Sequence, residues 1–597
     1  MATTTTAAAA AAASKNKPRT YSLIPRREIE ALISEGRNII IVDQHVLKVD
    51  GWMKYHPGGD KAIKHMVGRD ATDEVNGLHS AEAREMMEKY RIGRIEGRWK
   101  NFLPPIQGGR FRPRVLEGKE EVEEEDESGR LGVEVRRSGS ESERTASNEG
   151  SEGSTRSPSP VFDERLRNRK GLASSASSTS LSSVDAESEK EEGEKPVDGM
   201  AHLDILTRKE IKLDLEKYPP IDQDTQEAIV QKYRQLHERI KAEGLYDCNY
   251  WAYAIECTRY SIFFGLMLLF LKWGWYLPSA FFLGVFWHQL VFSAHDAGHM
   301  GITHNFQIDT IIGILIADFA GGLSLGWWKR NHNVHHIVTN SPEHDPDIEH
   351  MPFFAISHRF LAGLRSTYYE RIMHYDAAAK FFISMQHNLY YVVMLFARFN
   401  LYRLSWEYII KGQGPKKGIA AWHRYLELAG QVFFWIWFGY GVMYKSIEGN
   451  WNRFMFLMVS HAVTTPLHVQ ITLSHFAMST ADLGVDESFP QKMLRTTMDV
   501  DCPTWLDFFH GGLQFQAIHH LYPRIPRHNL RKTQHLVQEF CNEVGIPYAL
   551  YGFVDGNKEV IGRLAEVARQ AAILKKCQTV FLEGDGEKGH HHHHHHH

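Results

Sequence analysis

Apolar residues gather between positions 258 and 475, in runs that approach the ~20 residues a helix needs to cross a bilayer. Four of these runs are candidate membrane spans: Arg259–Leu277, Pro278–Ala294, Leu426–Tyr444 and Trp451–Ile471. Aromatic residues in the KWGWYLP turn between the first two runs are typical of a membrane interface. The pattern therefore predicts two helical hairpins that span the membrane.

Two other apolar stretches are interrupted by polar residues. Thr310–Trp328 contains Asp318 and several glycines, and Lys380–Phe399 contains Gln386 and His387. Such interruptions favour interfacial or buried helices over spans. Because four spans return the chain to its starting side, we expect the N-terminal domain and the segments that follow each hairpin to share one face, the cytosolic one.

The polar parts of the chain differ from one another in pattern. Residues 20–107 mix short β-like runs, Ile39–Val42 and Val46–Val49, with helical stretches, which predicts a compact α+β domain. Residues 201–257 carry apolar residues at helical spacing and predict amphipathic helices. Residues 108–200 are rich in Ser, Gly, Arg and Glu and too poor in apolar residues to fold, so we expect a disordered linker.

The two ends complete the domain plan. Residues 1–19 are expected to form a flexible Ala/Thr tail, and residues 576–597 a tail that ends in a purification tag, His590–His597. The remaining stretch, 201–575, is the predicted membrane domain. The expected fold class is multidomain, with an α+β N-terminal domain, a disordered linker and an all-α, four-span membrane domain under a cytosolic cap.

Composition adds three constraints. The formal net charge of -4 gives no indication of a nucleic-acid partner. The five cysteines are scattered without a C-x-x-C spacing, so they indicate neither a disulfide framework nor a cysteine zinc site, and they fit a reducing cytosol. Histidine is the informative residue, with 35 in the chain, many of them in tight clusters.

The N-terminal domain carries two separated histidines in distinctive surroundings. His56 begins the sequence HPGGD, and His79 closes the sequence GRDATDEVNGLHS. This pattern resembles cytochrome b5, and the resemblance implies a b-type haem (haem b) held axially by His56 and His79. A haem with both axial positions filled suits electron transfer rather than oxygen binding.

Three histidine clusters accompany the apolar segments. They are His295 with His299, then His332 with His335 and His336, then Gln516 with His519 and His520. Spacings of i, i+3 and i+4 place side chains on one face of a helix, so each cluster can converge on a metal. A single H-x-x-H-H is more often a zinc-like or incidental match, but three clusters on one predicted face favour a redox metal. Iron fits best, because zinc has no redox chemistry and the haem needs an electron acceptor.

This constellation resembles the membrane fatty-acyl desaturase superfamily, in particular its cytochrome b5-fused front-end branch with a glutamine-led third cluster. Within that branch the likeness is greatest to fungal sphingolipid delta-8 desaturases. Many relatives have Q-I-E-H-H where this chain has Q-A-I-H-H. This difference leaves the identity of the substrate open but does not affect the prediction of metal binding. The resemblance implies a cytosolic di-iron centre with one more ligand, for which His475 has the right place.

The expected iron ligands, which are also the expected catalytic residues, are His295, His299, His332, His335, His336, His475, His519 and His520. Gln516 occupies a ligand-like position, and direct binding, binding through water and an indirect role all stay open. We expect structural roles for His304, His344 and His350, and we expect Asp296, Asp345 and Asp347 to orient ligating imidazoles. His288 and His468 either face the substrate path or are satisfied buried histidines.

The resemblance implies a multi-pass enzyme of the endoplasmic reticulum membrane with its haem domain and histidine clusters in the cytosol. It desaturates a lipid-linked chain with O2 as co-substrate, and NADH–cytochrome b5 reductase supplies electrons through the haem. The favoured substrate is the sphingoid base of ceramide or glucosylceramide at the delta-8 position. The alternatives are a front-end acyl-lipid or acyl-CoA desaturase, a b5-fused lipid hydroxylase, and a membrane-anchored haem electron carrier without enzyme activity.

Overall fold

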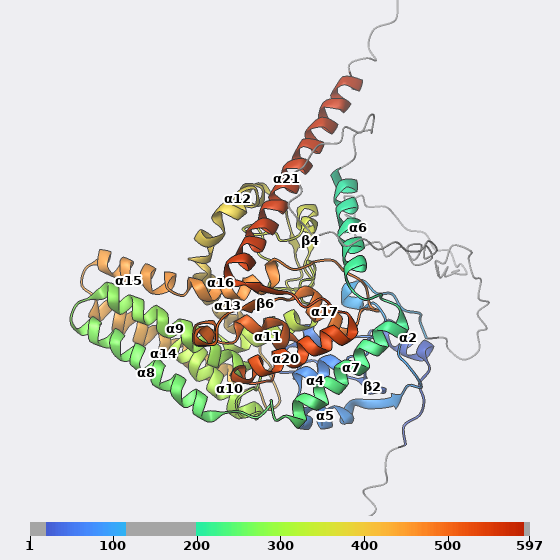
Figure 1. The fold of residues 1–597 in the computed structure, drawn as a ribbon, viewed down its shortest axis with the longest axis horizontal. Helices are drawn as coiled ribbons and strands as arrows, with labels where there is room; N and C mark the ends of the chain where they lie inside the picture. Colours follow the sequence, from blue (N-terminus) through green and yellow to red (C-terminus); the bar gives the residue numbers. More distant parts are fainter. Residues whose placement is uncertain (1–19, 115–198, 590–597) are drawn as a thin grey trace, which may run out of the picture.

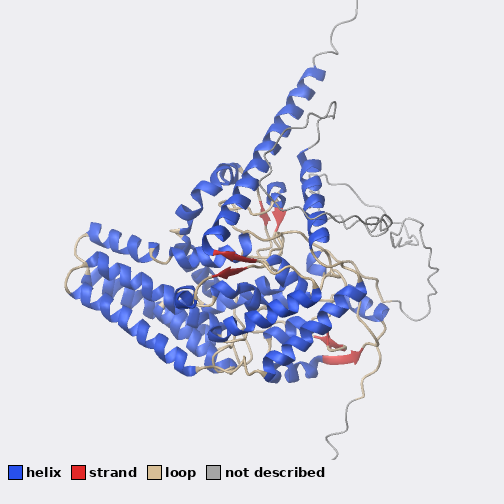
Figure 2. Ribbon diagram, viewed as in Figure 1, coloured by secondary structure: helices blue, strands red, loops and turns tan. Residues whose placement is uncertain are grey.

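The computed structural model describes residues 20–114 and 199–589, which form an N-terminal domain, an elongated helical bundle and a cap that joins them (Figure 1). Helices dominate, and the few strands are short (Figure 2). The predicted tail over 1–19, nearly all of the predicted linker over 108–200 and the tag lie outside the described residues.

The N-terminal domain is built on a three-stranded antiparallel sheet in the order β1-β2-β3. The two β-like runs predicted from the sequence are confirmed as β1 and β2, and Ile39 pairs with Lys48 at one end of their ladder. The elements of this domain are α2 (Arg26–Ser34), β1 (Ile39–Val42), β2 (His45–Lys48), α3 (Asp60–Lys64), α4 (Thr72–Leu78), α5 (Ala81–Met87) and β3 (Arg91–Arg94).

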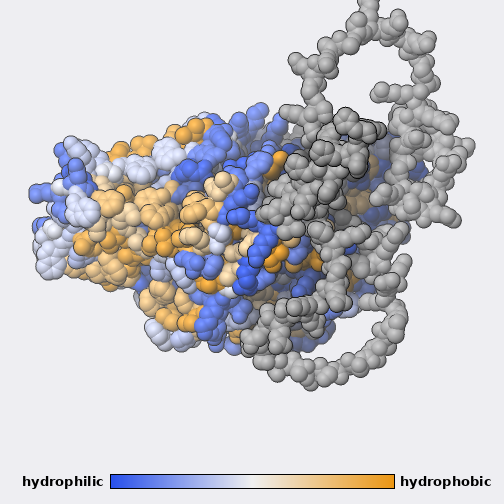
Figure 3. Space-filling model, turned by 90° about the horizontal axis from the view of Figure 1, so that it is seen from above, coloured by the Kyte–Doolittle hydropathy of each residue, from blue (hydrophilic) through white to orange (hydrophobic). Residues whose placement is uncertain are grey.

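Three described helices are long and apolar enough to cross a membrane: α8 (Tyr250–Lys272), α9 (Tyr276–Gly298) and the run of α15 (Asn450–Ala462) and α16 (Thr465–Phe476). A fourth crossing is available if Phe306–Ala320, which begins with α10 (Phe306–Ile314), and α11 (Leu325–Val338), bent by 116°, count as one span. The apolar surface of the bundle lies at the end of the molecule away from the N-terminal domain (Figure 3).

The predicted span over 426–444 is not among these helices. Its apolar run is divided between α14 (His423–Phe434) and a π-helical segment that follows without a break, Trp435–Ser446, each 12 residues long. The stretch predicted to be interfacial or buried over 310–328 falls on the bent pair. The four-span topology therefore stays a prediction.

The cap is not purely helical, which corrects the all-α expectation. Two small sheets occur in it: β4 (Leu364–Arg365) with β5 (Ile372–Met373), antiparallel, and β6 (Asp499–Asp501) with β7 (Leu550–Gly552), parallel. The other elements of this half are α6 (Gly199–Lys217), α7 (Gln223–Ala242), α12 (Ala377–Met394), α13 (Ala397–Ile410), α17 (Phe489–Thr496), α18 (Asp507–His510), α19 (Gln516–Leu521), α20 (Arg527–Val544) and α21 (Phe553–Gly589). Helix α21 continues past residue 575, where the sequence placed the end of the domain.

The second interrupted stretch, Lys380–Phe399, forms most of α12 and the start of α13. Its Gln386 is fully buried, donates to the backbone carbonyls of Ala355 and Leu564, and accepts from the Ala355 amide at 2.9 Å. A buried side-chain amide with its donors and acceptor satisfied in this way fixes α12 against its neighbours. This agrees with the prediction of a buried helix.

Candidate metal centre and haem site

The eight predicted iron ligands meet at one place although four separate helices carry them. His295 lies in the last turn of α9 and His299 directly follows that helix, α11 carries His332, His335 and His336, α16 carries His475, and α19 carries His519 and His520. The bend of 116° before α11 turns that helix back toward the end of α9, which is how the first two clusters come together.

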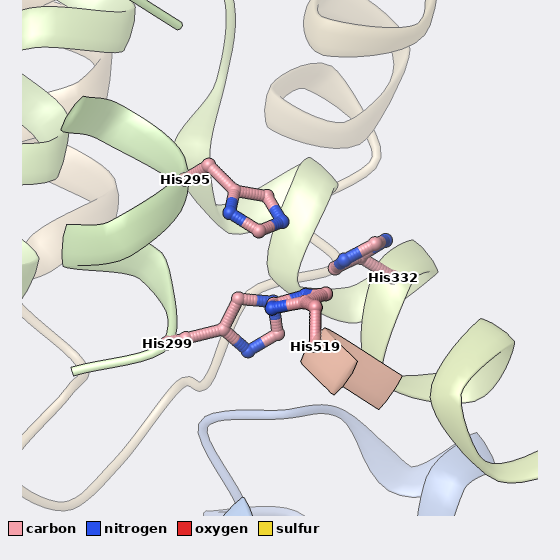
Figure 4. Close-up of side chains that lie close together, drawn as sticks. All are labelled: His295, His299, His332 and His519. Atoms are coloured by element: carbon pink, nitrogen blue, oxygen red, sulfur yellow. The ribbon is translucent and has the colours of Figure 1, made fainter. Parts of the chain in front are cut away.

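The side chains fall into two groups of ring nitrogens, and within each group one nitrogen per residue lies within 4.8 Å of the others. The first group is His295, His299, His332 and His519 (Figure 4). The second is His335, His475 and His520, in which His335 Nε2 and His520 Nε2 are 3.2 Å apart. His336 lies between the groups, because its Nε2 is 3.1 Å from His332 Nε2 and its ring stacks on His520 at 4.3 Å.

The electrostatics of this cluster suit metal binding. Burial, reinforced by the neighbouring imidazoles, holds the pKa of His299, His519 and His520 well below the ordinary value, so these rings are neutral. His299 Nε2 and His519 Nε2 are buried without a hydrogen-bond partner among the described residues. Unpaired buried imidazole nitrogens are costly, and neutral imidazole is the form that ligates a metal. The donor set therefore fits two metal ions of the kind that imidazole prefers.

Two of the three predicted orienting carboxylates hold ligand rings. His335 Nδ1 donates to Asp345 Oδ2 at 2.8 Å, which leaves His335 Nε2 for a metal, and Asp345 is fully buried. Asp347 Oδ2 lies 3.5 Å from His332 Nδ1. Asp296 lies farther from its ligand, 4.0 Å from His295 Nδ1, and accepts hydrogen bonds from the Tyr253 hydroxyl and from Arg527, both at 2.5 Å.

Replacing Asp345 with asparagine is expected to lower iron affinity by about 10- to 100-fold, because the charged acceptor that fixes the His335 ring is lost. The measurement is iron per protein after dialysis against a graded chelator. Asp347→Asn is the matched control and should have a smaller effect, since its contact with His332 is long and its side chain is 25% exposed. Equal iron affinity in Asp345→Asn and the unmodified protein would contradict the assigned role.

The other histidines stand apart from the two groups. Both ring nitrogens of His304 lie 2.8 Å from backbone carbonyl oxygens, and His344 Nδ1 bonds the Thr367 hydroxyl at 3.1 Å. His350 and His468 line the cavity described below, whereas the buried His288 accepts from the Gln289 amide at 3.2 Å and stacks on Phe509. Gln516 is buried and lines the same cavity.

A cavity of about 940 Å³ runs past the histidine cluster. His295, His332, His335, His475 and His519 form one part of its wall. Apolar side chains from the loop before α12, from α12 itself and from α13 form much of the rest, including Phe353, Leu389, Val392, Phe396 and Leu404. A mostly apolar cavity beside a polar, metal-binding wall suits a long alkyl chain.

The two predicted haem ligands face each other in the N-terminal domain. The His56 and His79 rings have centroids 5.9 Å apart and planes at 32°. His56 Nδ1 donates to the Gly59 carbonyl at 2.7 Å, and His79 Nδ1 lies 3.3 Å from the Val75 carbonyl, so both Nε2 atoms are left for a ligand. Two imidazole–metal bonds of ~2.0 Å each fit between rings at this spacing.

The N-terminal domain docks directly on α11, a contact that the sequence did not reveal. Asp60 pairs with Arg330 at 3.0 Å, and a Cβ at Gly58 would lie only 2.5 Å from Asn333 Nδ2, so a larger residue there would displace the Asn333 side chain. Val334 and Ile337 join the apolar core of the N-terminal domain. Arg330, Asn333, Val334 and Ile337 occupy the face of α11 opposite its three metal-site histidines.

Docking also brings together two histidines, His65 of the N-terminal domain and His344 of the surface on which that domain docks. His65 is fully buried, and its ring lies 5.3 Å from that of His344. Burial holds the pKa of His65 well below its ordinary value and lowers that of His344 to about 4. The charged groups that act on the pair are Lys61, Arg69, Lys492, Arg359 and Asp482.

Docking is therefore expected to weaken under acidic conditions. Both rings are neutral when docked and take up protons near their ordinary pKa of 6.5 when released, so the stabilisation is complete above about pH 6.5 and declines as the pH falls toward 4. The thermal midpoint of unfolding should fall between about pH 7.5 and pH 5.5, and fall less in the His65→Gln, His344→Gln double variant. An equal fall in both proteins would contradict this origin.

Comparisons with known proteins agree with both halves of the molecule. The family described as Fatty acid desaturase matches residues 271–552, and the family described as Cytochrome b5-like Heme/Steroid binding domain matches residues 25–96. A Delta 8-(E)-sphingolipid desaturase of Emericella nidulans is 63% identical over 93% of this chain and 96% of its own length. Proteins of the same description from Candida albicans and Kluyveromyces lactis are 47% and 48% identical, over 95% and 93% of this chain and 99% and 94% of their own lengths.

The two matches confirm the resemblances recognised in the sequence and carry cofactor consequences. The N-terminal family implies haem and the desaturase family implies iron, in agreement with the two histidine sites. The apolar helices agree with a membrane protein. With matches to both domains and relatives that it covers almost end to end, the chain belongs to the family of cytochrome b5-fused lipid desaturases.

Proposed function

We propose that this enzyme introduces a double bond at the delta-8 position of the sphingoid base of a ceramide or glucosylceramide. The observation that carries the proposal is the apolar cavity that passes directly along the buried histidine cluster. The relatives that cover nearly the whole chain bear the name Delta 8-(E)-sphingolipid desaturase, which supports the sphingoid base as substrate.

We assign the eight clustered histidines as ligands of two irons. Bound there, the irons would supply the O2-dependent oxidation that an unactivated methylene pair requires and that no side-chain acid or base can perform. The protein holds His335 in one tautomer through Asp345 and His332 through Asp347. Gln516 faces the same cavity, where it can contact either an iron or the lipid chain.

We assign His56 and His79 as the axial ligands of haem b, with electrons reaching the haem from NADH–cytochrome b5 reductase. Both Nδ1 atoms are tied to backbone carbonyls, which fixes the rings with Nε2 inward. We place the enzyme in the endoplasmic reticulum membrane with the haem domain and the iron site on the cytosolic side, because the reductase must reach the haem domain.

The test is lipid analysis of yeast that lacks its own sphingolipid desaturase and expresses this chain, with mass spectrometry that locates new double bonds. A new bond at C8 of the sphingoid base, absent when His335→Ala is expressed, is the expected result. A new bond in acyl chains instead would favour the second candidate, an acyl-lipid desaturase. A Borago officinalis relative that is 34% identical over 58% of this chain bears the name Acyl-lipid (9-3)-desaturase. A hydroxylated product without a double bond would refute desaturation.

A further inference from the structure

One short hairpin lies between the haem domain and the lipid cavity. Its strands are β4 and β5, joined by the turn 366–371, and we call residues 364–373 the bridging hairpin. The turn contacts the haem domain through some of its residues and lines the cavity through others. These two sets of contacts alternate along the turn.

On the haem-domain side, polar contacts centre on a buried lysine, whose ion-pair partner Glu370 is itself 68% exposed. Lys61, only 5% exposed, donates its Nζ to the Thr367 carbonyl at 3.1 Å and forms an ion pair with Glu370. The Thr367 hydroxyl lies 3.3 Å from His65 Nε2. Tyr368 packs against the apolar core that the haem domain shares with α11.

On the cavity side, Tyr369 and Arg371 form part of the cavity wall, and the Arg371 guanidinium lies 5.1 Å from the centroid of the Tyr369 ring. The Ser366 hydroxyl donates to Glu349 at 2.6 Å, and Glu349 also lines the cavity. A lipid that fills the cavity therefore contacts the same turn that Lys61 of the haem domain binds on its other side.

The backbone of the turn is held in an uncommon conformation. Glu370 has φ of 55°, in the left-handed region that residues other than glycine rarely adopt. Such a conformation persists where the surroundings hold it. Here the turn's own bonds, from Ser366 N–H to the Arg371 carbonyl and from Tyr369 N–H to the Ser366 hydroxyl, act together with the Lys61 contacts to Thr367 and Glu370. Release of the haem domain would remove the Lys61 contacts and leave the turn less constrained, which would alter the wall formed by Tyr369 and Arg371.

We propose that the bridging hairpin couples occupancy of the lipid cavity to docking of the haem domain, so that each favours the other. The proposal rests on the proposed function insofar as the cavity holds the lipid. Because coupling between two binding events is reciprocal, lipid should strengthen docking by the same factor as docking strengthens lipid binding. Electrons would then be delivered preferentially to enzyme that already holds its lipid.

The test uses the full-length protein, loaded with haem and iron, in lipid nanodiscs without reductant. Amide hydrogen exchange in α4 reports docking, because Asp73 in that helix pairs with Arg234 of α7 at 2.8 Å, away from the hairpin. Adding a ceramide with a saturated sphingoid base is expected to slow this exchange about fivefold. In Glu370→Gly, which removes the partner of Lys61 and frees the turn, the slowing should disappear and the ceramide Kd should rise about fivefold.

Asp73→Asn is the matched control, because it weakens docking at a contact outside the hairpin. Exchange in this variant should be faster overall but should still slow on addition of ceramide. Equal slowing in Glu370→Gly and in the unmodified protein would overturn the coupling. The coupling would also be overturned if the unmodified protein bound ceramide in these nanodiscs without any change in the hydrogen exchange of α4. Absence of any ceramide binding would overturn both the coupling and the proposed substrate.

Discussion

Replacing His335 with alanine is expected to lower desaturation by more than about 100-fold and to reduce the iron content of the purified protein. His335 lies at the centre of the second group of ligands, where its Nε2 faces that of His520 and its Nδ1 is tied to Asp345. Alanine removes one ligand and leaves the buried Asp345 carboxylate without its imidazole partner. The measurement is iron per protein together with the double-bond content of the lipid product.

The control for this substitution is His304→Gln, at a histidine that follows the first cluster closely in sequence but bonds only backbone carbonyls and an arginine. It should keep its iron and most of its activity. The haem absorbance of His335→Ala should match that of the unmodified protein, because His56 and His79 lie in the other domain. Full iron content and activity in His335→Ala would refute its assignment as a ligand.

Replacing His79 with alanine is expected to abolish the absorbance bands of six-coordinate haem and to stop NADH-driven desaturation, again by more than about 100-fold, because one of two axial positions is lost. The same variant should keep its full content of non-haem iron, since the ligands of those irons come from other helices. The two histidine substitutions thus have opposite signatures: one removes non-haem iron and spares the six-coordinate haem, and the other removes the six-coordinate haem and spares the non-haem iron.

His45→Ala is the matched control within the haem domain. Its ring is partly exposed and bonds Glu88 at 2.6 Å, away from the facing pair of rings. Its haem spectrum and its turnover should be unchanged. If His79→Ala retained a six-coordinate haem spectrum, the assignment of the axial pair would be wrong.

Local spacing made most of the metal site predictable. His332, His335 and His336 share a helical face by sequence alone, and the structure brings that face against the clusters from α9 and α19. His475 was different, because the other histidine of α16, His468, is seven residues away and forms no i, i+3 or i+4 cluster with it, so only the family resemblance selected it. The short hydrogen bonds of Asp296 were not predictable, because its partners Tyr253 and Arg527 lie 43 and 231 positions away in the chain.

The docking of the two domains was beyond the reach of local patterns. Asp60 and Arg330 form a pair across 270 positions, and nothing in either neighbourhood identifies its partner. The span expected over 426–444 stays a prediction for a related reason: hydropathy registers the apolar run but not the change from α-helix to π-helix at Trp435. Local patterns predicted the composition and the secondary structure of a segment, whereas its contacts with distant segments required the structure.

Helix α11 carries metal-site histidines on one face and contacts the haem domain with the other, and this restricts which haem domains can be exchanged into the enzyme. A chimera carrying another b5 domain must present a small residue at the position of Gly58, an acid at that of Asp60 and an apolar patch for Val334 and Ile337. Substitutions that adapt α11 to a foreign domain fall between its metal-site histidines in sequence or directly beside them. The two domains are therefore expected to have diverged together rather than as interchangeable modules.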